Sequence, residues 1–329
     1  MTESAGAISP TVSKARSNIY TNFVTTIDAF LRRGLDITAS LIGLIFLAPL
    51  FLWIAVRMRQ DSPGPVFYRG PRIGLNGKNF GILKFRTMYE KPESYQGSRV
   101  TGKDDPRVTA YGAWLRNTKI NELPQLWNVL VGDMSLVGPR PEDPNIAQEW
   151  PETTRKEIVS VRPGITSPAT ILYRDEEAQL QNQHSVLDDY LRNIMPSKLR
   201  LDTLYIKNRN ILTDLDIVFW TVIVLLPYMK RIPIPERRLY WGPVANFTSR
   251  YVVWFMRDAL ITFLAIALTG LLWRTGGPLD IGFSVSVWLA CMIAIIFSII
   301  NAIFGLSEVE WHRAPASDVI GLGLSVFIA

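Results

Sequence analysis

The sequence predicts a mainly helical α+β membrane protein with three parts: a proline-broken membrane helix, a small soluble domain and a C-terminal helical hairpin. Three observations support this fold class. Hydrophobic residues form 48% of the 329-residue chain and gather in long uncharged runs near its two ends. The segment from Gly64 to Arg140 between those runs carries 12 lysines and arginines against 6 acidic residues. Its turn signals are typical of short strands followed by helices.

The composition excludes several kinds of site. The single Cys291 rules out an intramolecular disulfide and any cysteine-rich metal site. His184 and His312 are the two histidines, which disfavours a histidine zinc site or a Ser-His-Asp triad. The polar first 20 residues lack the apolar core of a cleavable signal peptide. The basic charge suits an anionic membrane surface or a phosphate-bearing substrate, and no nucleic-acid-binding motif accompanies it.

A membrane helix is predicted over residues 22–60, after a disordered Ser/Thr/Ala-rich tail at 1–21. The charge-free run Ile37–Val56 is long enough to cross a bilayer. Pro49 interrupts this run and invites a kink. Basic residues stand at both ends of the run: Arg32, Arg33, Arg57 and Arg59. The positive-inside bias then places both ends on the cytoplasmic side, which predicts a re-entrant helix; a straight span is the alternative.

A soluble domain is expected from residue 61 to residue 240. Short strands are predicted around Asn76-Gly77, which is a strong hairpin signal. Lys84 and Arg86 alternate with Phe85, so the two cations would share one face of a strand. The glycines of this region match neither the phosphate-loop nor the dinucleotide-binding fingerprint.

The stretch from Asp105 to Pro141 holds the candidate site. A helix carrying Trp114 is expected to end near Glu122, because Pro124 should push Leu123 out of helical geometry. Asn121 and Glu122 would then lie at a turn that is open to a ligand. Two proline-bound turns present cations suited to phosphate: Arg140 within Gly138–Pro141 and Arg162 within Val161–Pro168.

This pattern indicates phosphate chemistry assisted by a hard metal ion. The alternative is an ordinary helix C-terminus with basic residues near the negative end of its dipole.

Helices are predicted for the rest of the chain. Residues 142–161 have some helical character, and Pro196 is expected to break a solvated helix over 175–205. The apolar part of 216–228 is too short to cross a membrane and predicts a buried or interfacial helix. Within the last part, 241–329, the runs 259–273 and 281–307 predict a transmembrane hairpin. A third apolar run, 319–329, is short, which predicts a chain truncated from a longer protein.

Several motifs in one order resemble the bacterial sugar transferase family, the monotopic phosphoglycosyl transferases that prime glycan assembly on a polyprenyl phosphate. The resemblance covers roughly Phe23–Leu226. Its motifs are GPVFYRGPRIG, FGILKFRTM, VRPGITSPA and DPRVTAYGAWLRNTKINELPQLWNVLVGDMSLVGPRP. More loosely, residues 259–329 resemble the membrane leader of polysaccharide-synthesis epimerases and dehydratases.

The resemblance implies transfer of a phosphosugar from a nucleoside diphosphate sugar, usually a UDP-sugar, to polyprenyl phosphate, with Mg²⁺ and release of UMP. It implies a re-entrant anchor in the bacterial inner membrane and a small catalytic domain on the cytoplasmic face. Membrane lipid is an expected partner, and a second copy or downstream glycan-assembly enzymes are further expected partners. Asn121 takes the position of the nucleophile and Glu122 that of a base or metal ligand. The implied phosphate-binding residues are Lys84, Arg86, Arg116, Arg140 and Arg162.

One departure from the family pattern concerns the nucleophile. The family has Asp-Glu before Leu-Pro, whereas this chain has Asn121-Glu122. A neutral amide is a far weaker nucleophile than a carboxylate. Three interpretations remain open: an engineered inactivation, a natural silent homologue, or an enzyme that recruits another group. The silent homologue would bind sugar nucleotide or polyprenyl phosphate as a scaffold. A transporter component is a further alternative because of the C-terminal hairpin.

Overall fold

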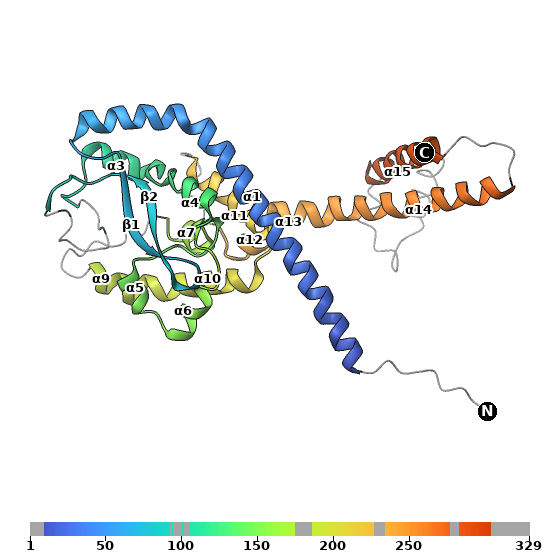
Figure 1. Ribbon diagram of the computed structural model, residues 1–329, viewed down its shortest axis with the longest axis horizontal. Helices are drawn as coiled ribbons and strands as arrows, with labels where there is room; N and C mark the ends of the chain where they lie inside the picture. Colours follow the sequence, from blue (N-terminus) through green and yellow to red (C-terminus); the bar gives the residue numbers. More distant parts are fainter. Residues whose placement is uncertain are drawn as a thin grey trace. The chain divides into compact units, whose positions relative to one another are not determined.

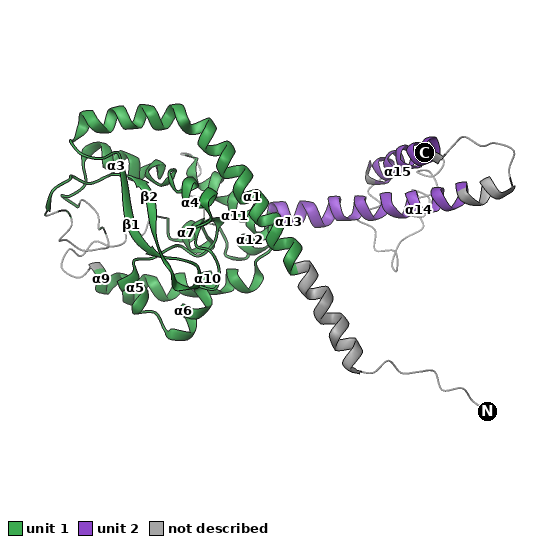
Figure 2. Cartoon of the chain, in the orientation of Figure 1, with its two compact units in different colours: residues 1–242 green, residues 243–329 purple. Residues whose placement is uncertain are grey.

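A computed structural model describes residues 10–92, 94, 101, 105–174, 186–226, 234–276 and 283–303. The chain divides into two compact units, residues 1–242 and 243–329 (Figure 2). This division lies beside the boundary expected between residues 240 and 241. The described part is mainly helical with two small sheets, in agreement with the predicted α+β class.

The first unit begins with the long helix α1, Pro10–Asp61, which contains Pro49. This helix starts at Pro10, within the tail expected at 1–21. Residues 1–9 of that tail lie outside the described residues. Figure 1 shows that α1 bends along its length, and a proline inside a helix is a common cause of such a bend. By length and composition, Thr25–Asp61 can cross a membrane.

The predicted hairpin is confirmed. Strands β1, Phe67–Ile73, and β2, Asn79–Phe85, pair antiparallel and are joined by a 3₁₀ turn at Leu75–Gly77. Asn76 and Gly77 have φ values of 56° and 75°, which explains why this dipeptide suits the turn. Strands β3, Ser135–Val137, and β4, Gly164–Thr166, form a separate parallel pair.

The helix before Glu122 is shorter than expected. Helix α3, Ala110–Asn117, ends well before Glu122, and Lys119 takes a left-handed conformation with φ 60°. A 3₁₀ turn, Ile120–Glu122, follows, and α4, Gln125–Val131, begins after Pro124. Leu123 is helical, with φ −56° and ψ −33°, so its predicted exclusion from helical geometry is wrong. Pro124 precedes the start of a helix, where the missing N–H costs nothing.

Short helices and two longer ones complete the first unit. The short ones are α5 (Pro144–Gln148), α6 (Glu152–Ile158), α7 (Pro168–Leu172), α9 (Val186–Asp189) and α12 (Arg237–Tyr240). A π-helical turn, Tyr190–Ile194, leads into α10, Met195–Asn208. Helix α11, Ile211–Leu225, follows after Asn210, whose side chain caps it.

Two expectations for this region need correction. Pro196 does not break the helix around it, because it lies in the first turn of α10, where proline is tolerated. The face of α10 that carries Leu199, Leu201 and Tyr205 is buried, so α10 is not a solvated helix. The expected start of that helix, residues 175–185, lies outside the described residues.

Buried side chains gather in several clusters of the first unit. One joins α5 and α6 to α10, and another joins β3, α10, α11 and α12. The second half of α1 supplies Ile54 and Met58 to a cluster with Phe85 and Leu115. Helix α11 buries Ile217 and Trp220 and exposes Phe219 and Val222. It therefore matches the buried or interfacial helix that its short apolar run predicted.

The second unit begins with α13, Pro243–Phe247, and a π-helical turn, Thr248–Val252. Helices α14, Val253–Gly276, and α15, Phe283–Ile303, pack against each other. Pro243–Gly270 and Ser284–Asn301 can each cross a membrane by length and composition. The third apolar run, 319–329, lies outside the described residues.

Candidate active site

The predicted site has Glu122 at its centre. Its Oε1 lies 2.7 Å from Nζ of Lys84, at the end of β2, and 2.9 Å from Nη2 of Arg140. Nη1 of Arg140 lies 3.4 Å from the second carboxylate oxygen, so the guanidinium approaches both oxygens. The Glu122 side chain is only 14% exposed. Three of the seven predicted site residues therefore meet, although 38 residues separate Lys84 from Glu122.

The charges in this cluster change the pKa values of its members. Burial favours the neutral acid, yet the positive charges of Arg140 and Lys84 outweigh it and hold the pKa of Glu122 well below its usual range. Burial, reinforced by Arg140, lowers the pKa of Lys84 to about 8 although Glu122 opposes the shift. Two cations thus face one carboxylate, which leaves positive charge available for an anionic ligand.

Asn121 lies beside this cluster with an unsatisfied polar atom. The residue is 8% exposed, and its Oδ1 is buried without a hydrogen-bond partner. Nε2 of Gln125, one turn further along the chain, is also buried and unpaired. Unpaired buried polar atoms cost free energy, so both groups indicate a place where a ligand supplies the missing partners.

Asn128 on α4 holds the Lys84 strand in place. Its Oδ1 accepts a hydrogen bond of 2.8 Å from the backbone N–H of Leu83, and its Nδ2 donates one of 2.9 Å to the carbonyl of Gly81. These bonds attach α4 to β2 next to Lys84. Sequence reasoning did not single out Asn128, because the pairing joins residues more than 40 positions apart.

Two glycines allow the proline-bound turns to approach each other. A Cβ added to Gly138 would meet the backbone around Arg162 and Gly164, and one added to Gly164 would meet the backbone of Gly138. The backbone N–H of Gly164 donates to the carbonyl of Pro139 at 2.9 Å. The turn that presents Arg140 is therefore fixed against the turn that follows Arg162.

The other predicted cations have different surroundings. Arg86 is 6% exposed, and its guanidinium donates to the carbonyls of Pro65, Ser62 and Met88, which favours a structural role. Arg162 donates to the carbonyl of Gly132 at 2.9 Å.

Arg116 is half-buried and lies 3.4 Å from the hydroxyl of Thr87. Neither this contact nor those of Arg86 and Arg162 reach Glu122, and their phosphate-binding roles stay predictions.

Sequence reasoning also missed Asp202 on α10. The residue is 4% exposed, and burial raises the pKa of its carboxyl group to about 7. No local pattern indicated it, because Asp202 lies 62 residues after Arg140 in a helix that looked solvated.

The donor set around Glu122 fits a divalent cation that the substrate helps to bind. The described residues contain no group of three or more histidine, cysteine or acidic side chains able to hold a metal ion. Glu122 offers one carboxylate, and Oδ1 of Asn121 is an oxygen without a partner. Mg²⁺ in proteins often takes one or two carboxylates and completes its shell with water and substrate phosphates.

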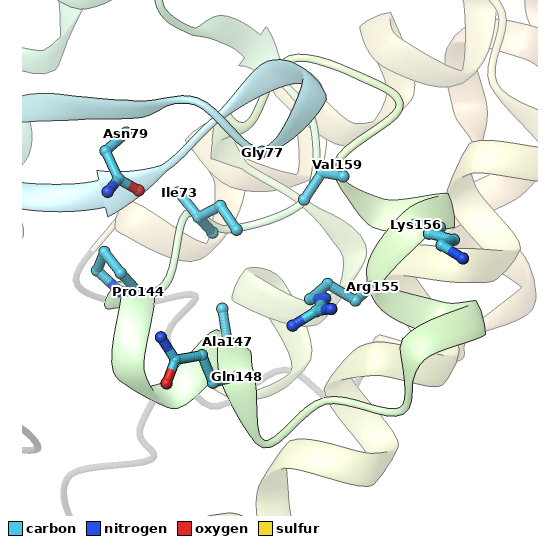
Figure 3. Close-up of a pocket in the computed structure, with 9 residues that line it drawn as sticks. All are labelled: Ile73, Gly77, Asn79, Pro144, Ala147, Gln148, Arg155, Lys156 and Val159. Carbon is cyan, nitrogen blue, oxygen red and sulfur yellow. The ribbon is translucent and has the colours of Figure 1, made fainter.

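A hollow in the first unit lies among other residues than the predicted site. Its volume is about 340 Å³, and Figure 3 shows Arg155 pointing into it between Ala147 and Val159, whereas Lys156 points away. Lys156 pairs with Glu152 at 2.6 Å. None of the predicted site residues lines this hollow, so it lies outside the Glu122 cluster.

The chain is similar in sequence to several proteins of known activity. It is 39% identical over 200 residues to an undecaprenyl-phosphate glucose phosphotransferase of Komagataeibacter xylinus, an alignment that covers 59% of this chain and 36% of the relative. It is 35% identical over 204 residues to a UDP-N-acetylgalactosamine-undecaprenyl-phosphate N-acetylgalactosaminephosphotransferase of Aeromonas hydrophila, covering 60% of this chain and 44% of the relative. The chain thus spans less than half the length of these two relatives.

A shorter relative is matched over most of its length. The exopolysaccharide production protein PSS of Rhizobium leguminosarum bv. phaseoli is 37% identical over 207 residues, which cover 60% of this chain and 95% of that protein. The model of the family described as "Bacterial sugar transferase" matches residues 27–227, a range that holds α1 from residue 27 on, both sheets and the whole Glu122 cluster. The chain therefore belongs to the bacterial sugar transferase family.

Proposed function

We propose that this protein transfers a phosphosugar from a nucleoside diphosphate sugar, a UDP-sugar, to polyprenyl phosphate and so primes exopolysaccharide or other glycan assembly. The observation that carries the proposal is the cluster in which Lys84 and Arg140 both contact Glu122. Two cations that share one carboxylate suit a ligand with two phosphates. The names of the relatives favour this activity over a silent homologue.

In the proposed reaction, one phosphorus–oxygen bond of the donor's diphosphate breaks and one forms to the acceptor. UMP leaves with the bridging oxygen, and the sugar-bearing phosphorus becomes bonded to an oxygen of polyprenyl phosphate. Arg140 grips two phosphate oxygens with its planar guanidinium, and Lys84 adds a point charge. Glu122 keeps these cations aligned before the donor arrives.

The group at position 121 determines which oxygen attacks. Because the Asn121 amide is a weak nucleophile, we assign the attack to the acceptor phosphate itself rather than to a protein side chain. Asn121 and Glu122 would hold Mg²⁺ together with the donor's phosphates, and the bound ion would offset the negative charge on them. The arginines Arg86, Arg116 and Arg162 remain proposed phosphate-binding residues of the same reaction.

The proposed location is the bacterial inner membrane, with the first unit on the cytoplasmic face. Support comes from the contacts of α1. Near its first half, Arg33 donates to the carbonyl of Val129 at 2.8 Å, and Asp36 accepts from the N–H of Leu136 at 2.8 Å. Near its second half, Ile54 packs with Leu115. A helix that contacts the same domain just before the apolar run and again near its end favours a re-entrant anchor over a straight span.

Transfer of radiolabelled sugar in membranes tests the proposal. Membranes containing the protein are incubated with UDP-glucose, UDP-galactose and UDP-N-acetylgalactosamine, each labelled in the sugar. We expect label in the extracted polyprenyl lipid and an equal amount of released UMP, whereas release of UDP would mean that sugar moves without phosphate. The Glu122→Gln variant keeps the size of the side chain and should lose transfer.

If the chain binds these donors and transfers none of them, the proposal fails and the silent homologue is the better description.

A further inference from the structure

The segment that leaves the Arg140 turn is anchored by a polar cluster that the proposed reaction does not use. One residue, Pro141, separates Arg140 from Glu142. Oε1 of Glu142 accepts a hydrogen bond from the hydroxyl of Tyr190 and lies 3.7 Å from Nζ of Lys198. Nζ of Lys198 also donates to the Tyr190 hydroxyl at 3.1 Å. The three side chains therefore form a closed triangle of polar contacts, called here the Glu142 triangle.

This triangle is largely removed from solvent. The side chains of Glu142 and Lys198 are 18% and 6% exposed, and Tyr190 is 3% exposed. The ring of Tyr190 belongs to the core cluster that joins α5 and α6 to α10, and the ammonium of Lys198 lies 5.0 Å from the centre of that ring. Charge-assisted bonds are stronger where water is excluded. The carboxylate of Glu142 is therefore held firmly against α10.

The main chain of the same segment is bonded to the hairpin that carries Lys84. The backbone N–H of Ile73, the last residue of β1, donates to the carbonyl of Glu142 at 3.0 Å. The next residue, Asp143, lies 3.7 Å from Arg72 of β1. Glu142 is thus fixed on one side by its carbonyl to β1 and on the other by its carboxylate to Tyr190 and α10.

The connection from Glu142 to the guanidinium of Arg140 is short and stiff. Peptide bonds are planar, and Pro141 fixes its own φ, so few rotatable bonds separate the two residues. On the other side of Arg140, the N–H of Gly138 donates to the carbonyl of Thr166 at 3.0 Å. The chain is therefore held both before and after Arg140.

We propose that Glu142 is a positioning residue for sugar-nucleotide binding: its anchored side chain sets where the guanidinium of Arg140 meets the donor's diphosphate. This inference rests on the proposed function. The Arg140 guanidinium approaches the two carboxylate oxygens of Glu122 at 2.9 and 3.4 Å, and a shift of its backbone would disturb this two-point contact. A group that is already in place need not be ordered when the ligand arrives, which favours binding.

The chemistry of the Glu142 triangle argues for a task beyond packing. A buried ion pair loses hydration, and apolar residues of similar volume often stabilise a fold equally well. Directional polar bonds instead define a single geometry, and a turn that grips two phosphate oxygens depends on its geometry. Tyr190 opens the π-helical turn before α10, and such turns are frequent at functional sites.

A double-mutant cycle on donor binding tests the proposal. Tyr190→Phe removes the hydroxyl and keeps the ring in the core. Tyr240→Phe is the matched control, because it removes another hydroxyl that bonds α10, at the carbonyl of Leu201 and a distance of 3.0 Å. Each change is also made together with Arg140→Lys, which keeps a positive charge and loses the planar two-point grip. Calorimetry with UDP-glucose and Mg²⁺ gives the Kd, and thermal melts check that each variant folds.

Where Arg140 is present, we expect Tyr190→Phe to weaken UDP-glucose binding roughly fivefold, because Glu142 loses one bond to its charged oxygen. In the Arg140→Lys background the same change should cost less than about twofold, since a point charge on a flexible stem depends less on the backbone. Tyr240→Phe should leave the Kd unchanged in both backgrounds. In turnover, Tyr190→Phe should raise KM for the donor more than it lowers kcat.

Glu142→Gln tests the same idea without a change at Tyr190. The amide oxygen still accepts a hydrogen bond but carries no charge opposite Lys198, so donor binding should again weaken, and more strongly with Arg140 than with Arg140→Lys. An unchanged Kd in Tyr190→Phe and Glu142→Gln would overturn the inference. Equal losses in the two backgrounds would also overturn it, because they would mean a general loosening of the domain. Absence of phosphosugar transfer by a protein that shows this coupling would instead overturn the proposed function and leave the role of Glu142 in place.

Discussion

The residue at position 121 decides between two reaction routes in one binding site: attack by a protein carboxylate or attack by the acceptor phosphate. The Asn121 side chain is buried and its Oδ1 has no partner, so an aspartate would find the same space and a nearly identical shape. The added charge would lie beside Glu122, and the two cations there, Lys84 and Arg140, can offset the repulsion. The rest of the site should therefore tolerate the change.

We expect the unmodified chain to bind UDP-sugar and to form little or no covalent phosphosugar adduct, because the amide cannot replace a carboxylate nucleophile. Asn121→Asp should form an adduct 1:1 with the protein and release UMP without acceptor. Intact-protein mass spectrometry after incubation with UDP-sugars measures both, and Asn76→Asp, which adds the same charge at an exposed turn outside the cluster, is the control. A strong adduct on the unmodified chain would mean that another side chain attacks.

The second residue-scale prediction concerns Lys84. Because burial lowers its pKa to about 8, its positive charge is lost as the pH rises through 8, and donor binding should weaken there. Lys84→Arg keeps its charge to a much higher pH and should move this alkaline limit upward by more than one pH unit. The measurement is the Kd for UDP-glucose between pH 7 and pH 10.

Lys119→Arg serves as the control for Lys84→Arg, because Lys119 is exposed and lies outside the ion-pair cluster. It should leave the alkaline limit in place. An alkaline limit that is the same in Lys84→Arg and the unmodified protein would show that a different group titrates.

At the scale of elements, the sequence predicted correctly those structures that depend on residues close together in the chain. The Asn76-Gly77 turn followed from residues that accept positive φ, and the strands on either side followed from it. Pro124 misled the helix prediction for a related reason. The restriction on the residue before proline is a preference, and Leu123 adopts helical angles because the chain turns at once into α4.

The sequence predicted the residues of the candidate site but not the contacts between them. The family motifs named Glu122 and Arg140, yet their contact with Lys84 depends on the pairing of α4 with β2 through Asn128. Hydrophobic periodicity in the sequence cannot predict a hydrogen bond between Leu83 and Asn128, which lie 45 positions apart. Lys119 shows the same limit, since a lysine with φ 60° carries no sequence signal for a left-handed turn, unlike a glycine.

At the scale of the whole first unit, the anchor and the site share one set of contacts. Arg33 of α1 donates to the last carbonyls of α4, at Val129 and Leu130, and Asp36 accepts from Ser135 and Leu136 of β3. Helix α4 follows the Asn121-Glu122 turn, and β3 leads into the Arg140 turn. The membrane helix therefore supports both halves of the candidate site, in a bent path that Figure 1 shows.

These contacts predict the topology of α1. Since its two halves hold the same domain, residues before and after the apolar run should lie on the cytoplasmic side. Asn22→Cys and Asn76→Cys, each in a Cys291→Ala background that removes the native thiol, should both resist a membrane-impermeant maleimide in intact cells and react after the membrane is opened. Labelling of Asn22→Cys alone in intact cells would contradict the re-entrant arrangement and favour a straight span.

Adding Asp36→Ala to these variants gives a graded test. The substitution leaves two donors of β3 unpaired, at a cost of roughly 1–3 kcal/mol each, and should weaken the contact between the domain and the first half of α1. Some Asn22→Cys molecules should then become reactive from outside, whereas Asn76→Cys should stay protected, because Ile54 and Met58 still fix the second half to Phe85 and Leu115.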